Sequence, residues 1–161
     1  MGSALRLTLA PGVWVDWETA CADIERAGHC NAEGNVREAY GWALAAYMIA
    51  REGLLPGEEA PWLVQKREQL NALLMRSIDA LIHIYRATEN FDMAAQFAEE
   101  SIARDPLREA TYQKLIDIYA ATGQASAAMR AYQRCRDALA ELGRSPSTAL
   151  EDAYRRALVH S

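Results

Sequence analysis

Two segments of the chain are related by a spacing of 34 residues. In each segment a leucine and a tyrosine are followed, nine residues after the tyrosine, by an alanine; these residues are Leu81, Tyr85 and Ala94, then Leu115, Tyr119 and Ala128. A repeat of this length indicates stacked helix pairs, in which each unit buries its apolar face against the next. The small alanine would let the two helices of a pair approach closely, while the leucine and tyrosine fill the space between them. This period constrains the fold more than any other feature of the sequence.

The order of large and small residues is typical of tetratricopeptide units, and a weaker copy of the pattern lies earlier in the chain. Val36 and Ala39 precede Phe91 and Ala94 by 55 residues, which predicts a third, degenerate pair. We therefore expect an all-α fold, a right-handed superhelical stack of about three tetratricopeptide-like helix pairs with a C-terminal capping helix. The alternative is an irregular helical bundle that uses the same residues as its core.

Hydrophobic periodicity and capping residues predict the individual helices. Asp105 is expected to cap the fifth helix, with Pro106 in its first turn, and Ser145 with Pro146 is expected to begin the seventh. The third helix has no internal breaker and is unusually long for a globular protein. The predicted helices cover residues 17–27, 35–50, 61–88, 90–104, 106–122, 125–141 and 146–159.

The N-terminal segment differs from the helical remainder. Residues 5–9 alternate apolar and polar side chains, and Pro11 and Gly12 then turn the chain. This pattern favours a short hairpin over a helix. We expect residues 1–15 to be a tail or hairpin remnant of a preceding domain, and residues 16–161 to form the helical domain.

Charge and composition exclude several classes of function. The chain has 17 Lys plus Arg against 22 Asp plus Glu, a net charge of −5. A domain that binds duplex DNA needs a basic surface to displace counterions, so we expect no direct DNA binding. Three cysteines without paired spacing favour reduced thiols in a cytoplasmic protein and no metal site. The apolar stretch at residues 39–50 is too short to span a bilayer, so no membrane association is expected.

No pattern of a catalytic site is present. The sequence has no nucleophile elbow, no zinc-protease motif, no phosphate-binding loop and no dinucleotide fingerprint. Its three histidines are widely scattered. We expect a protein that is not an enzyme and that needs no cofactor.

A polar stripe on the third helix is the candidate binding site. Arg76, Asp79, His83 and Arg86 follow one another at helical spacing, away from the apolar stripe of the same helix. The first helix of each pair lines the concave side of such a stack, where Gln113 and Asp117 of the fifth helix would join them. Basic groups there could hold an acidic segment or a carboxylate terminus of a protein partner. An ordinary solvated helix face is the alternative.

Several short motifs follow one another along the chain: Gly53-Leu54-Leu55-Pro56-Gly57, Pro61-Trp62, Asp105-Pro106-Leu107-Arg108-Glu109, Glu141-Leu142-Gly143 and Pro146-Ser147. In combination and order they resemble those of the bacterial transcriptional activator domain found in SARP-type regulators. These regulators join an N-terminal winged-helix DNA-binding domain to a tetratricopeptide-like region. The similarity covers about residues 13–158, although no helix-turn-helix is present.

The resemblance implies a non-catalytic interaction or effector module of a transcriptional activator. Its partner would be a winged-helix DNA-binding domain, RNA polymerase or a second copy of the chain, so a homodimer is one possibility. A free-standing tetratricopeptide adaptor for an unrelated peptide is the alternative function. The structural motif would consist of Leu54, Leu55, Pro56, Gly57 and Trp62 as a clasp, with Tyr85 and Tyr119 between the helices.

Overall fold

A computed structural model describes residues 16–52 and 61–159, and the side chains from Val64 onward in the second range. Within these ranges the chain forms seven α-helices and no strand, as predicted. The predicted hairpin at residues 1–15, the segment from Leu54 to Gly57 and the Trp62 side chain lie outside the described residues. The helices are α1 (Asp16–Ala32), α2 (Val36–Arg51), α3 (Pro61–Ala87), α4 (Phe91–Arg104), α5 (Glu109–Ala121), α6 (Ala125–Ala140) and α7 (Thr148–Val159).

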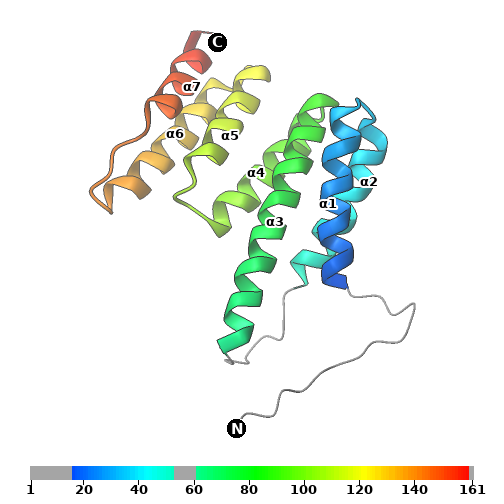
Figure 1. Cartoon of the computed structure of the whole chain (residues 1–161). Helices are drawn as coiled ribbons and strands as arrows, with labels where there is room; N and C mark the ends of the chain where they lie inside the picture. Colours follow the sequence, from blue (N-terminus) through cyan, green and yellow to red (C-terminus); the bar gives the residue numbers. More distant parts are fainter. Residues whose placement is uncertain (1–15, 53–60, 160–161) are drawn as a thin grey trace, which may run out of the picture.

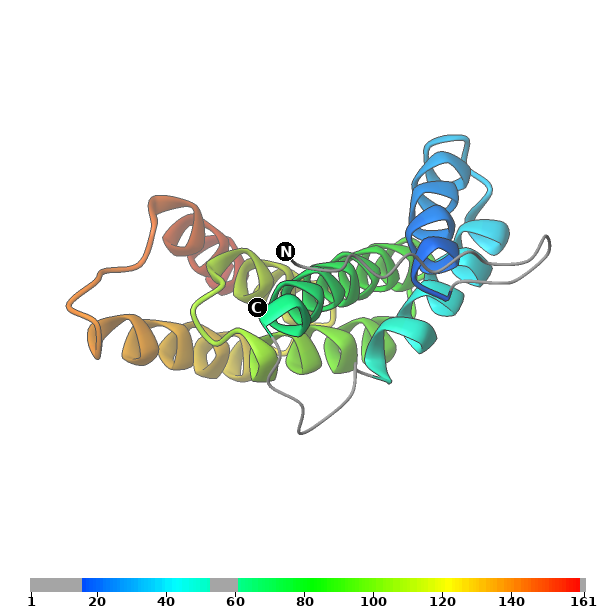
Figure 2. The same cartoon turned by 60° about the horizontal axis from the view of Figure 1, so that its bottom comes forward.

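The helices pair in chain order and the pairs stack side by side (Figure 1). Helices α1, α3, α5 and α7 form one layer, and α2, α4 and α6 form the other (Figure 2). The stack is curved, and the first helices of the pairs lie on its inner side (Figure 2). The predicted architecture of three pairs and a final helix is confirmed.

The three turns inside the pairs share one backbone geometry. Gly34, Glu89 and Gly123 occupy the same place in each turn and all have positive φ angles, of 78°, 57° and 68°. In each turn the next residue donates its N–H to a carbonyl five residues earlier, at 2.8 Å. This Schellman closure satisfies carbonyls at the helix end and reverses the chain. Its recurrence after α1 shows that α1 and α2 are a true repeat unit despite the irregular spacing.

Small residues set the distance between the helices of a pair. Ala39, Ala94 and Ala128 are each 0% exposed, in the second helix of each pair. Leu81 and Leu115 are equally buried in the first helices of the second and third pairs. The rings of Tyr85 and Tyr119 pack against this core and remain half-buried. The spacing argument from the sequence therefore places the core correctly.

Helix α7 covers the end of the stack. Its buried side chains, Leu150, Ala153 and Ala157, belong to the common core. Tyr154 stacks on Tyr132 of α6, with ring centroids 4.3 Å apart. The exposed side of α7 carries Arg155 and Arg156, which suits a terminal helix that faces water.

Two predicted helix starts are wrong. Asp105 does not cap the fifth helix: it ends α4, and its carboxylate accepts the Leu107 N–H at 3.2 Å in a turn that delays α5 until Glu109. The seventh helix begins at Thr148, where the Ser147 hydroxyl accepts the Leu150 N–H at 3.4 Å. Both errors arise because Asp and Ser before proline stabilise turns as readily as helix starts.

The conformation of Glu89 generates a prediction about stability. A side chain at positive φ strains the backbone, and the corresponding residues of the other two turns are glycines. Glu89→Gly should raise the free energy of unfolding by about 0.5–1 kcal/mol, measured by urea denaturation. Gly123→Ala is the matched control and should lower it by about 1 kcal/mol, because no atom lies near enough to hinder a methyl group and only φ opposes it. If the two substitutions changed the free energy of unfolding in the same direction, the backbone strain assigned to these two positions would be contradicted.

Candidate partner-binding groove

A groove runs between α1 and α3, the first helices of two adjacent pairs. It consists of two cavities of about 310 and 410 Å³, and Arg76 lies between them and lines both. The first contains Asp79 and His83, and the second contains Trp17 and Lys66. The structure therefore brings three of the six predicted binding residues, Arg76, Asp79 and His83, into one groove.

Arg76 is tied across the groove to α1. Its guanidinium donates to the Glu25 carboxylate at 2.5 Å, and this bond holds the pKa of Glu25 below its usual value. Both side chains are more than half exposed. An ion pair so open to water is weak and can exchange partners. Breaking the bond between Arg76 and Glu25 therefore costs little free energy, and Arg76 can bind another carboxylate instead.

The second cavity is lined by the apolar ring of Trp17 and by an unreactive thiol, that of Cys21. The Lys66 ammonium lies 5.4 Å from the centroid of the Trp17 ring. Burial raises the pKa of the neighbouring Cys21 thiol, with a smaller opposing effect from Arg76. A thiol with a raised pKa is a poor nucleophile, so Cys21 acts here as a wall of the cavity.

Asp79 has a structural role that the sequence did not reveal. Its two carboxylate oxygens accept hydrogen bonds from Arg108 and Lys114, each at 2.6 Å. These two cations belong to the start of the third pair, so Asp79 joins α3 to that pair on the inner side of the stack. With Asp79 only 23% exposed and both partners 31% exposed, this cluster is less hydrated than the Arg76 pair. One nitrogen of Arg108, Nη1, is buried without a hydrogen-bond partner among the described residues.

The other three predicted residues lie away from the cavities. Arg86 is on α3 beyond His83 and is half-buried, outside the residues that line the groove. Gln113 and Asp117 are on α5, and Asp117 pairs with Arg156 of α7 at 3.4 Å. The six predicted residues are thus divided into three that line the groove and three that do not, one at the end of α3 and two on α5.

Sequence reasoning missed the residues that hold the site together. Besides Arg108, the adjacent Glu109 accepts the backbone N–H of Ser147 at 2.7 Å and so fixes the connection to α7. Both residues belong to the Asp-Pro-Leu-Arg-Glu motif, which served only as a mark of resemblance. That motif was the signal available in the sequence. Two adjacent charged side chains at the start of a helix point to different sides of it and can therefore bind two different parts of the protein.

Some other features are absent from the part of the chain that the structure describes. Across residues 16–52 and 61–159, no three side chains of the types that bind metal gather as ligands. No described helix is both long enough and apolar enough to cross a bilayer.

Burial raises the pKa of the Cys135 thiol to about 11, so this cysteine is a core residue.

The unequal hydration of the two ion-pair clusters yields a prediction. Asp79→Asn should lower the free energy of unfolding by about 1–2 kcal/mol, because Arg108 and Lys114 then repel each other without a counter-charge. The loss should shrink in 1 M NaCl, measured by urea denaturation at both salt concentrations. The control, Glu25→Gln, should change stability by less than about 0.5 kcal/mol, because its bond to Arg76 is exposed. Equal losses in the two variants would contradict the assigned structural role.

A solved structure has the same fold at low sequence identity. It is the C-terminal tetratricopeptide-containing domain of an FK506-binding protein from Plasmodium falciparum, with a TM-score of 0.65 and 12% identity. The alignment covers 91% of this chain and 92% of that domain. The likeness confirms the all-α, right-handed superhelical stack of tetratricopeptide-like pairs. A comparison with curated protein sequences gave no match.

The family comparison agrees with the resemblance drawn from the short motifs. The model of the bacterial transcriptional activator domain matches residues 15–158, which include all seven helices except the last residue of α7. The chain therefore belongs to the bacterial transcriptional activator domain family.

Proposed function

We propose that this domain is the non-catalytic interaction module of a bacterial transcriptional activator, and that its α1–α3 groove binds an acidic segment of a protein partner. The observation that carries the proposal is the groove itself, which lies on the inner face of the stack and gathers Arg76 and His83. The setting that we propose, on the ground of the family, is transcription in the bacterial cytoplasm. We assign the domain the task of recognition there, because the groove offers cations and apolar walls for a polypeptide segment to contact.

The charge around the groove favours an acidic occupant. The residues that line it, together with their ion-pair partners, include four permanent cations and two carboxylates. The cations are Lys66, Arg76, Arg108 and Lys114, and the carboxylates are Glu25 and Asp79. This local excess is opposite in sign to the net charge of −5 for the whole chain. A local positive surface on an acidic protein steers an acidic segment to one place.

Apolar walls give the groove a second means of recognition. Ile24 and Ala27 contribute to one cavity, and Trp17 contributes to the other. A segment that alternates acidic and apolar side chains would use both the cations and these walls. Arg86, Gln113 and Asp117 would contact the flanks of such a segment along the inner face.

Three candidate partners can be compared directly. They are a winged-helix DNA-binding domain, RNA polymerase and a second copy of the chain. Sedimentation equilibrium measures self-association, and biolayer interferometry measures binding of a winged-helix domain or bacterial RNA polymerase.

A double charge reversal tests the groove. Arg76→Glu with Arg86→Glu should leave the fold intact by circular dichroism and weaken binding of the true partner by about tenfold or more. Arg136→Glu with Arg155→Glu is the matched control, because both residues lie on α6 and α7, far from the groove in sequence, and are exposed. If the control weakens binding as much as the groove variant, or if none of the three partners binds, the proposal fails.

A DNA titration tests the expectation that the domain does not bind nucleic acid by itself. The purified chain should show no affinity for duplex DNA beyond weak, non-specific association at physiological salt. Fluorescence anisotropy between 50 and 200 mM salt provides the measurement. Tight binding that falls steeply with salt would contradict the expectation and would place a basic DNA-binding face on the domain.

A further inference from the structure

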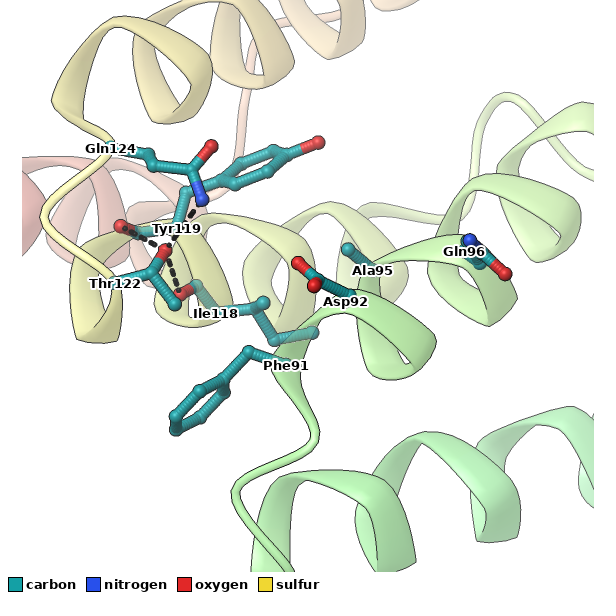
Figure 3. A pocket seen from close by; sticks show the side chains of 8 residues that line it. All are labelled: Phe91, Asp92, Ala95, Gln96, Ile118, Tyr119, Thr122 and Gln124. Atoms are coloured by element: carbon teal, nitrogen blue, oxygen red, sulfur yellow. Dashed lines mark hydrogen bonds between the residues drawn. The ribbon is translucent and has the colours of Figure 1, made fainter.

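A second pocket lies between the second and third helix pairs, apart from the groove. Its volume is about 330 Å³. The first two turns of α4 form one wall, and the end of α5 with the turn into α6 forms the other (Figure 3). Its lining residues include Asp92 and Ala95 on α4 and Tyr119 on α5, and none of them lines the α1–α3 groove.

The repeat provides an internal comparison for this pocket. The junction between α2 and α3 corresponds to the junction between α4 and α5, with Tyr85 at the position of Tyr119. The backbones match closely: the Thr88 hydroxyl donates to the carbonyls of the residues four and three positions before it, at 3.0 and 3.2 Å. Thr122 makes the same two bonds, at 3.2 Å each. Differences in side chains at the two junctions can therefore be compared position by position.

At the first junction, between α2 and α3, a tyrosine ring fills the space that corresponds to the pocket. Tyr40 of α2 places its ring edge-on against Tyr85, with centroids 5.6 Å apart and an interplanar angle of 69°. The two hydroxyl groups are also hydrogen-bonded at 3.2 Å. The position of Tyr40 is taken at the second junction by Ala95, which has no ring to offer. By this correspondence of positions, the pocket beside Tyr119 lies where a tyrosine ring stands one repeat earlier.

Tyr119 has unused capacity for such a contact. Among the described residues it makes no ring–ring contact, and its hydroxyl has no hydrogen-bond partner. Burial raises the pKa of Tyr119, and Glu99 adds to this effect while Arg134 and Arg130 oppose it more weakly, so the phenol stays protonated and able to donate. Aromatic rings prefer the edge-to-face geometry that Tyr40 and Tyr85 adopt.

We propose that the pocket between α4 and α5 binds an aromatic side chain of a partner polypeptide, which takes beside Tyr119 the place that Tyr40 takes beside Tyr85. The neighbouring residues of that polypeptide are basic. Asp92 lines the pocket, is exposed, and has no ion-pair partner among the described residues, whereas the first junction carries Arg37 at the same position. The carboxylate therefore selects a lysine or arginine next to the aromatic residue.

Peptide titration followed by ¹⁵N NMR tests the proposal. The probe is an acetylated, amidated pentapeptide of sequence GKYKG, added to the intact chain. Saturable shifts should appear at the amides of residues 91–96 and 118–124. The peptide GKAKG should cause none, and GEYEG should bind more weakly than GKYKG.

Two substitutions probe the pocket from within. Ala95→Tyr reproduces the first junction by filling the space in cis, and it should weaken binding of GKYKG more than tenfold. Asp92→Asn keeps the shape and should weaken it by about two- to fivefold, the range for an exposed ion pair. Thermal unfolding shows whether each variant is folded. If Ala95→Tyr does not fold, the conservative Asp92→Asn variant still tests the pocket.

The first junction offers the reverse experiment. Tyr40→Ala should open the same space beside Tyr85 and create a second site, with new shifts at residues 36–41 and 84–90. Because Arg37 replaces Asp92 there, this new site should prefer GEYEG to GKYKG. A gain of binding cannot come from simple destabilisation.

Several results would overturn the inference. They are the absence of localised shifts with GKYKG, unchanged binding in Ala95→Tyr, or tighter binding of free tyramine than of the peptide, which would assign the pocket to a small molecule. The groove proposal is independent of this site: Arg76→Glu with Arg86→Glu should leave GKYKG binding unchanged. Failure of one proposal is therefore distinguishable from failure of the other.

Discussion

The close approach of two helices at a buried alanine is the contact on which this structure depends. Ala39, Ala94 and Ala128 are fully buried, one in each pair. The same Schellman turn, with one residue at positive φ, precedes each of them. A larger residue would separate the helices and lose packing with the leucine opposite. The pairs stack side by side as similar units, and the stack is curved (Figure 2). Both the α1–α3 groove and the α4–α5 pocket are spaces between such units.

The sequence predicts this part of the structure because burial leaves a periodic signal. Leu81 and Leu115, fully buried, were placed in the core from spacing alone, and all seven helices were found. Helix starts were less predictable, as Asp105 shows: its carboxylate accepts an N–H in either a turn or a helix cap. The choice depends on how α5 packs against α4, α6 and α7, and no local pattern records that packing.

The candidate groove was predictable only in outline. Arg76, Asp79 and His83 share one face of α3, and helical spacing is sufficient to show it. Their partners are far away in sequence: Glu25 precedes Arg76 by 51 residues, and Lys114 follows Asp79 by 35. Long charged side chains meet across a stack according to its curvature, and the curvature arises from all the pairs together. The division of this stripe into an exchangeable Arg76 and a structural Asp79 therefore required the three-dimensional arrangement.

Repetition also explains why a binding site can arise between pairs without disturbing the fold. The Tyr40–Tyr85 contact lies at the edge of a junction whose interior is already closed by the alanines and leucines. Replacing a ring there by a methyl group, as at Ala95, opens space to solvent and leaves the helix spacing unchanged, since the matching hydrogen bonds of Thr88 and Thr122 show the same local backbone. A stack of similar units can thus keep one junction closed and use the next for recognition. The side chain that is missing at the open junction defines the shape of the ligand that fits it.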